Sequence, residues 1–195
     1  MIMRLWLSYL LLPIVLLALS GCGLLPPHAA PPRYHDFGPP VTGQPANAGL
    51  YLREVTAPAW LDSGEIQYRL LMTDSTQLRA YATARWIAAP SRLLAQRLRE
   101  QLPGTGSPHY GLRVELERFE QDFDTPDHAR AVMQLHAVIT AADGTTLAAH
   151  DFTFSTPTPP DVAGAITGLA ALAQQATEAI LAWSASVSPE AMHGT

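Results

Sequence analysis

Alternating apolar and polar residues predict three consecutive strands in the second half of the chain. In YGLRVELERFE, residues 110–120, apolar side chains alternate with charged ones until Phe119 breaks the phase, which predicts a bulge or a strand end. The alternation resumes over 129–141 and 147–155, on either side of Asp143-Gly144, a dipeptide typical of hairpin turns. The pattern therefore predicts an antiparallel meander with one polar face.

Two other stretches repeat their apolar residues with the period of a helix. In the first, Pro90 is suited to a first helical position and Pro103-Gly104 ends the pattern. Its predicted face is Ile87, Ser91, Leu94, Leu98 and Leu102. In the second, Thr158 and Asp161 fit an N-terminal capping pattern and Ser188-Pro189 ends the helix. Its single apolar stripe is Val162, Ile166, Leu169, Ala173, Ala176, Ile180, Trp183 and Val187.

Shorter strand signals lie in the first half of the domain. The stretch 50–58 is β-like and ends at a proline, and EIQYRLL, residues 65–71, alternates with period 2. A turn at 74–78 leads into a short strand through 79–81. We expect an α+β fold in the order β-β-α-β-β-β-α: a mostly antiparallel sheet of about five strands, with two helices packed on one face.

The first 22 residues have the order of a secretory signal. Arg4 is followed by about 15 mostly apolar residues and then by the small residues Ser20 and Gly21. A membrane-spanning helix needs about 20 apolar residues, and this run is shorter and contains Pro13. We therefore predict a signal peptide over residues 1–21.

A proline-rich tether follows, over residues 22–48. Proline lacks a backbone donor and favours extended geometry, so this segment predicts a semi-rigid linker. Tyr34 and Phe37 within it leave two alternatives: stray aromatics in a tail, or a piece that docks on the domain as an edge strand. The predicted folded domain is 49–188, and 189–195 is a flexible tail.

Charge and composition exclude several classes of function. The net charge is -5, and all 12 basic residues are arginines scattered among 17 carboxylates. Nucleic-acid binding needs a clustered positive face, which no segment supplies. The single cysteine, Cys22, cannot form an internal disulfide.

The candidate catalytic and metal patterns all fail. Ser107 lacks the flanking glycines of a nucleophile elbow, and the histidines have no ligand-like spacing. DFDTPD, residues 122–127, has proline where a calcium loop needs an oxygen ligand, so a solvated turn is expected. Glu115 and Glu117 are expected on a solvated sheet face. We predict that the protein is not an enzyme and holds no metal or cofactor.

The position of the cysteine carries the first resemblance. Leu19-Ser20-Gly21-Cys22 resembles the lipobox of bacterial lipoproteins. The resemblance implies diacylglycerol on the sulfur of Cys22, cleavage before it and acylation of the new amino group. Stable anchoring needs two or more acyl chains. Gly23, where aspartate commonly means inner-membrane retention, favours the outer membrane, with the protein facing the periplasm.

Four further stretches resemble the ABC-type transport auxiliary lipoproteins, which include the C component of the paraquat-inducible (Pqi) system. They are APAWLDSGEIQYR (57–69), YATARW (81–86), LRVELERFE (112–120) and the alanine-rich last helix through Trp183. The resemblance covers roughly residues 34–187. One departure is that the family often reads D-R-P-x-I-V-x-R where this chain reads DSGEIQYR from Asp62, so that the turn lacks an arginine and a proline.

The resemblance implies a docking role beside an ABC transporter and an MCE-type periplasmic protein that moves lipid between two membranes. The partner contacts that we expect are Arg69, Tyr81, Arg85 and Trp86, with packing as the alternative for Tyr81 and Trp86. Whether the protein forms a homo-oligomer is left open. The alternative function is an envelope-assembly or structural lipoprotein that binds another periplasmic or outer-membrane protein machine.

Overall fold

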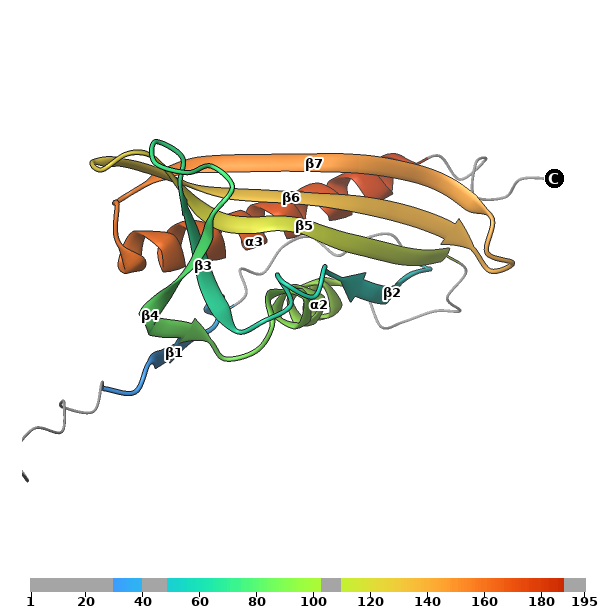
Figure 1. Ribbon diagram of the computed structural model, residues 1–195. Coiled ribbons are helices and arrows are strands. Elements are labelled where there is room, and N and C mark those ends of the chain that lie inside the picture. Colours follow the sequence, from blue (N-terminus) through green and yellow to red (C-terminus); the bar gives the residue numbers. More distant parts are fainter. Residues whose placement is uncertain (1–29, 40–48, 103–109, 188–195) are drawn as a thin grey trace, which may run out of the picture. The chain divides into compact units, whose positions relative to one another are not determined.

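The structure is a computed structural model that describes residues 30–39, 49–102 and 110–187 (Figure 1). The described residues from Pro32 onward belong to one compact unit. The predicted signal peptide, Cys22, most of the tether, Ser107 and the predicted tail lie outside the described residues.

The fold is α+β, as predicted, with one mixed sheet of seven strands and two helices. The strands are β1 (Arg33–His35), β2 (Leu50–Thr56), β3 (Glu65–Leu70), β4 (Leu78–Trp86), β5 (Tyr110–Thr125), β6 (His128–Ala141) and β7 (Thr146–Thr158). The helices are α2 (Pro90–Gln101) and α3 (Val162–Ser186).

The sheet order is β1-β4-β3-β5-β6-β7, and β2 also pairs with β5. The predicted meander of β5, β6 and β7 is antiparallel, and Gly144 takes a φ of 92° in the turn between β6 and β7. Three other pairs are parallel: β1 with β4, β2 with β5, and β3 with β5. The expectation of about five mostly antiparallel strands is corrected by these parallel pairs and by β1, which comes from the predicted tether.

The register of β5 shifts between Leu116 and Arg118 and the strand continues to Thr125, so of the two predicted alternatives the structure has the bulge and not the strand end. Two residues of the bulged strand there oppose one residue of β6, so the side chains beyond change face. Phe119 therefore continues the buried row begun by Leu112 and Val114.

Both helices cover one face of the sheet (Figure 1). Asp161 caps α3, because its side chain accepts a hydrogen bond of 2.7 Å from the Gly164 amide. On the predicted stripe, Leu169, Ala173, Ala176 and Ile180 are fully buried. Ile87, expected on the face of the first helix, is instead 65% exposed and lies just before α2.

No helix within the described residues is long and apolar enough to cross a membrane.

Candidate functional site

Residues 32–39 of the predicted tether, which we call the strap, are built into the fold. Its strand β1 pairs in parallel with the end of β4, and the Ile87 amide donates a hydrogen bond of 2.8 Å to the His35 carbonyl. A tight turn follows, in which the Gly38 amide donates to Asp36 Oδ1 at 2.8 Å. Gly38 has a φ of 72°, a conformation that glycine adopts without strain. Of the two alternatives, the structure therefore supports docking as an edge strand.

The strap contributes an aromatic ring to the core. Phe37 is 7% exposed, and its ring centroid lies 5.3 Å from that of Trp86 and 5.5 Å from that of Phe119. Trp86 and Phe119 lie 5.8 Å apart, so the three rings form one cluster. Edge-on and tilted packing of this kind is favourable beyond simple burial. The strap is thus part of the hydrophobic core and not a tail beside it.

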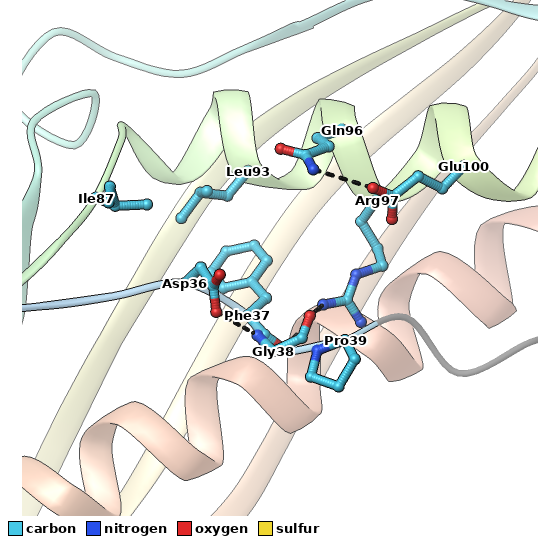
Figure 2. Close-up of a pocket in the computed structure, with 9 residues that line it drawn as sticks. All are labelled: Asp36, Phe37, Gly38, Pro39, Ile87, Leu93, Gln96, Arg97 and Glu100. Carbon is cyan, nitrogen blue, oxygen red and sulfur yellow. Dashed lines mark hydrogen bonds between the residues drawn. The ribbon is translucent and has the colours of Figure 1, made fainter.

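Arg97 of α2 binds the strap through hydrogen bonds (Figure 2). Its guanidinium donates to the Phe37 carbonyl at 2.8 Å, to the Gly38 carbonyl at 2.7 Å and to Gln174 Oε1 of α3 at 2.7 Å. The residue is 5% exposed, and no carboxylate in the described part of the chain pairs with it. Arg97 therefore joins the strap to both helices through neutral acceptors.

Two shallow hollows flank the strap. One, of about 280 Å³, lies towards α2 and is lined by Asp36, Phe37, Gly38, Pro39, Ile87, Leu93, Gln96, Arg97 and Glu100. The other, of about 390 Å³, lies towards α3 and is lined by Tyr34, His35, Asp36, Phe37, Gly38, Ile87, Ile166, Thr167 and Ala170. The strap and Ile87 thus border both hollows.

Of the four residues expected to contact a partner, Arg85 is the most accessible. Its side chain is 44% exposed and lies 3.5 Å from Glu65. Trp86, the next residue, is 2% exposed and belongs to the aromatic cluster. The two neighbours on β4 therefore differ sharply in what they can touch.

Arg69 and Tyr81 have partners inside the protein, on opposite faces of the sheet. The ring of Tyr81 packs tilted against that of Tyr68, with centroids 4.6 Å apart, and its hydroxyl donates to Gln121 Oε1 at 2.6 Å. Burial raises the pKa of Tyr81 well above its usual value, and Tyr68 and Asp161 raise it further. Arg69, which follows Tyr68 on β3, donates to both carboxylate oxygens of Glu120 at 3.1 and 3.2 Å.

Arg69 belongs to a cluster of charged side chains that the sequence did not predict. Its members are Arg69, Arg118, Arg130, Glu120, Asp122 and Asp124. The Asp122 side chain is 3% exposed, so the expectation of a solvated turn is wrong at this position. The cause is the bulge in β5, which turns Glu120 and Asp122 away from the helices and towards the side chain of Arg69.

The two buried carboxylates of this cluster have opposite pKa shifts. Burial raises the pKa of Asp122, and the nearby Arg118 only partly offsets that effect. Burial acts on Glu120 in the same direction, but the hydrogen bonds and the positive charges of Arg69 and Arg118 together outweigh it and lower the pKa of Glu120. These groups neutralise each other, and the described residues contain no group of His, Cys, Asp and Glu side chains arranged to hold a metal ion.

Comparisons with known proteins agree with this architecture. The crystal structure of a Xanthomonas campestris protein assigned to the family DUF330 aligns with a TM-score of 0.67 at 20% identity, over 80% of this chain and 94% of that one. That of an uncharacterized protein aligns with a TM-score of 0.62 at 15% identity, over 79% and 99% of the two chains. At such identities the likeness shows the fold alone.

The sequence itself identifies the family. No curated protein is similar enough in sequence to match the chain. A family model described as "ABC-type transport auxiliary lipoprotein component" matches residues 36–181, which is more than half of the chain and reaches into the strap. The chain therefore belongs to the family of ABC-type transport auxiliary lipoprotein components.

Proposed function

We propose that this protein is a lipid-anchored auxiliary subunit of an intermembrane lipid transport system of the Pqi type. It is fixed through Cys22 to the periplasmic side of the outer membrane and docks on an MCE-type subunit of the ABC transporter. It acts by holding and docking, not by catalysis. The observation that carries this proposal is the family match over 36–181, which begins 14 residues after the lipobox cysteine.

The strap supports a holding role. The segment nearest to Cys22 enters the core through Phe37 and is fastened by Arg97. An anchor that continues into the packed strap limits the positions of the domain relative to the membrane, whereas an anchor on a tail that did not pack on the domain would limit them less. The buried charges of the described residues serve the fold, because Glu120 and Asp122 are paired with arginines and Arg97 is hydrogen-bonded to neutral acceptors.

The anchor is tested by substituting the cysteine. Cys22→Ala should abolish incorporation of a palmitate analogue and leave an uncleaved or soluble product. Gly23→Asp tests the destination, since it should move the mature protein towards the inner-membrane fraction. Labelling of the Cys22→Ala protein would contradict the lipobox prediction, and an unchanged distribution of Gly23→Asp would contradict the sorting prediction.

Docking is tested at Arg85, whose side chain reaches the surface. Arg85→Glu should reduce co-purification with the MCE-type subunit by about tenfold, as expected for an interface arginine. Arg113→Glu is the matched control, because Arg113 is also an exposed arginine, 3.1 Å from a partly exposed glutamate, Glu54. Equal co-purification of both variants would place the docking surface elsewhere.

Trp86 needs a separate measurement. Because it is buried, Trp86→Ala should lower the free energy of unfolding by about 3–5 kcal/mol. We therefore expect any loss of co-purification in Trp86→Ala to accompany a loss of folded protein. The thermal midpoint of each variant distinguishes this effect from a lost contact.

A further inference from the structure

Two large apolar side chains stand side by side on the surface where the strap enters the fold. Among the described residues, Tyr34 is 62% exposed and Ile87 is 65% exposed, more than any other large hydrophobic residue. The backbones of their segments are joined, since the Ile87 amide bonds to the carbonyl of His35. Both side chains also line the hollow of about 390 Å³ towards α3. We call Tyr34 and Ile87 the entry patch.

The length of the preceding chain limits how far the entry patch can be from the lipid anchor. Pro32, where the compact unit begins, follows Cys22 by ten positions. Ten residues span at most about 36 Å even when fully extended. Strand β5 alone has 16 residues and is about 50 Å long. With the proposed anchor at Cys22, residue 32 therefore stays within about 36 Å of the membrane surface, whatever path the tether takes.

The opposite end of the long strands can lie much farther away. The turn between β6 and β7 adjoins the start of β5, where Tyr110 pairs with Ala141. β3 pairs with the second half of β5, through Gln67 and Glu120, and β1 pairs with the end of β4, which lies beside Glu65 at the start of β3. Figure 1 shows β1 at the lower left, beneath β4, and the β6–β7 turn far from it at the right.

The chemistry of the entry patch fits the surface of a bilayer. Tyrosine is enriched at membrane interfaces because its ring is apolar and its hydroxyl stays hydrated. Transfer of an exposed isoleucine side chain from water into the bilayer is favourable in free energy. The neighbouring Arg33 and Arg85 can keep their charges at the level of the headgroups. The arginines add little net positive charge at this surface, because Arg85 is paired with Glu65 and Asp36 is also exposed.

We propose that the entry patch inserts into the headgroup region of the same lipid leaflet that holds the acyl chains of Cys22. This inference rests on the proposed lipid anchor and goes beyond it, because it gives the domain a fixed orientation. With Tyr34 and Ile87 on the lipid, the long β5–β7 strands extend away from the membrane surface. A partner that touches Arg85 then meets it at the lipid surface.

The test uses the full lipidated protein with a single new cysteine. The thioether occupies the sulfur of Cys22, so a second cysteine is the one free thiol for a polarity-sensitive fluorophore. The labelled positions are Tyr34→Cys, Ile87→Cys and, as the matched control, Ala142→Cys in the exposed turn between β6 and β7. Circular dichroism checks that each variant is folded. The proteins are reconstituted into vesicles of phosphatidylethanolamine and phosphatidylglycerol that carry a spin-labelled lipid as quencher.

Insertion by about 5–10 Å should make lipid quenching at positions 34 and 87 at least about twofold stronger than at 142. Equal quenching at the three positions would overturn the proposal. The proposal would also be overturned if positions 34 and 87 were protected from an aqueous quencher and this protection were lost when the protein was diluted, because a second copy of the protein would then cover the entry patch. Flotation of the vesicles distinguishes a failure of this orientation from a failure of the lipid anchor. Protein that floats without enhanced quenching contradicts the orientation alone. Protein that neither floats nor takes up a palmitate analogue contradicts both proposals.

Discussion

At the scale of single residues, the protein places charges in its interior in two different ways. Arg97 is buried with three neutral acceptors, whereas Glu120 is buried between two arginines. A buried charge needs a complete set of hydrogen bonds, because a lost partner leaves a desolvated group. The two sites therefore predict different responses to substitution.

Replacement of Arg97 should release the strap. Arg97→Ala leaves the carbonyls of Phe37 and Gly38 without this donor, and we expect a loss of about 2–4 kcal/mol in the free energy of unfolding. Limited trypsin digestion offers a direct readout, because Arg33 lies within the strap and should become a cleavage site. Arg92→Ala, on the exposed side of the same helix, is the control and should leave Arg33 protected. Protection of Arg33 in both variants would contradict the role of Arg97.

Replacement of Glu120 should have an effect that depends on pH. At pH 7, Glu120→Gln should cost about 3–5 kcal/mol, because two arginines lose their buried carboxylate. The pKa of Glu120 is lower in the folded protein, so its contribution is complete above its unfolded pKa of about 4.3 and is lost as the pH falls through the folded value.

Urea unfolding at neutral pH and below about pH 4 measures this dependence. The difference in stability between wild type and Glu120→Gln should shrink at the lower pH. Glu117→Gln, an exposed change on the same strand, should stay within about 0.5 kcal/mol of wild type at both pH values. A cost for Glu120→Gln that is the same at every pH would mean that its charge is not what stabilises the fold.

At the scale of elements, α3 touches the sheet and the loop before it at two glycines that leave no room for a side chain. A Cβ atom at Gly168 would lie 2.3 Å from Thr158 Cγ2 and 3.0 Å from the Cβ of Ala131. A Cβ at Gly164 would lie 2.2 Å from the carbonyl oxygen of Pro159. The glycines thus bring the first turns of the helix against the end of β7, although glycine disfavours a helix interior.

We therefore expect Gly168→Ala to destabilise the protein in spite of its better helix propensity. Overpacking at this contact should cost about 1–3 kcal/mol, measured by urea unfolding. Adding Thr158→Ser should recover part of the loss, because it removes the Cγ2 methyl and keeps the hydroxyl that accepts from Gln121. Thr167→Ala, on the exposed side of the same turn, should change stability by less than about 0.5 kcal/mol. A Gly168→Ala protein as stable as wild type would contradict the prediction, because it would show that α3 shifts to accommodate the methyl group without a cost in stability.

Elements whose evidence is local could be predicted from the sequence. The long strands and α3 carry their own periodicity, and Phe119 signalled the bulge in β5 through its broken phase. The parallel pairs could not be predicted, because no pattern within β2 or β3 specifies β5 as its partner. The same holds for Arg69 and Glu120, which are 51 positions apart.

The candidate site was harder to predict because its signals are weak in sequence. Tyr34 and Phe37 stand in a proline-rich stretch without any period, and a three-residue strand leaves almost no alternation to detect. Arg97 reads as one of several arginines on a helix, and its role depends on carbonyls about 60 positions away. Trp86 is a single aromatic residue at a strand end, where the sequence leaves core packing and partner contact as equal alternatives.

At the scale of the whole molecule, the strap and the domain should unfold as one unit. Phe37 shares the aromatic cluster with Trp86 and Phe119, so the core is incomplete without the strap. In a two-state transition, tryptophan fluorescence and far-ultraviolet circular dichroism report the same midpoint. We expect this coincidence in the wild-type protein.

The two aromatic residues of the strap provide a matched pair. Phe37→Ala should lower the free energy of unfolding by about 3–5 kcal/mol and shift both midpoints together. Tyr34→Ala, at the exposed position, should change it by less than about 0.5 kcal/mol. An early fluorescence transition in wild type, separate from circular dichroism, would contradict the shared core.

The parallel pairing of β1 with β4 has a mechanical consequence. With the proposed anchor at Cys22 and a docked partner, any pull between the two would enter the domain through residue 32. Tension along β1 loads its backbone hydrogen bonds, the Phe37 ring and the Arg97 contacts together, in shear. In shear, these contacts would have to break at the same time. If the strand were peeled away instead, they would break one after another. The domain should resist such tension at its point of attachment, and its core should yield before the strap detaches alone.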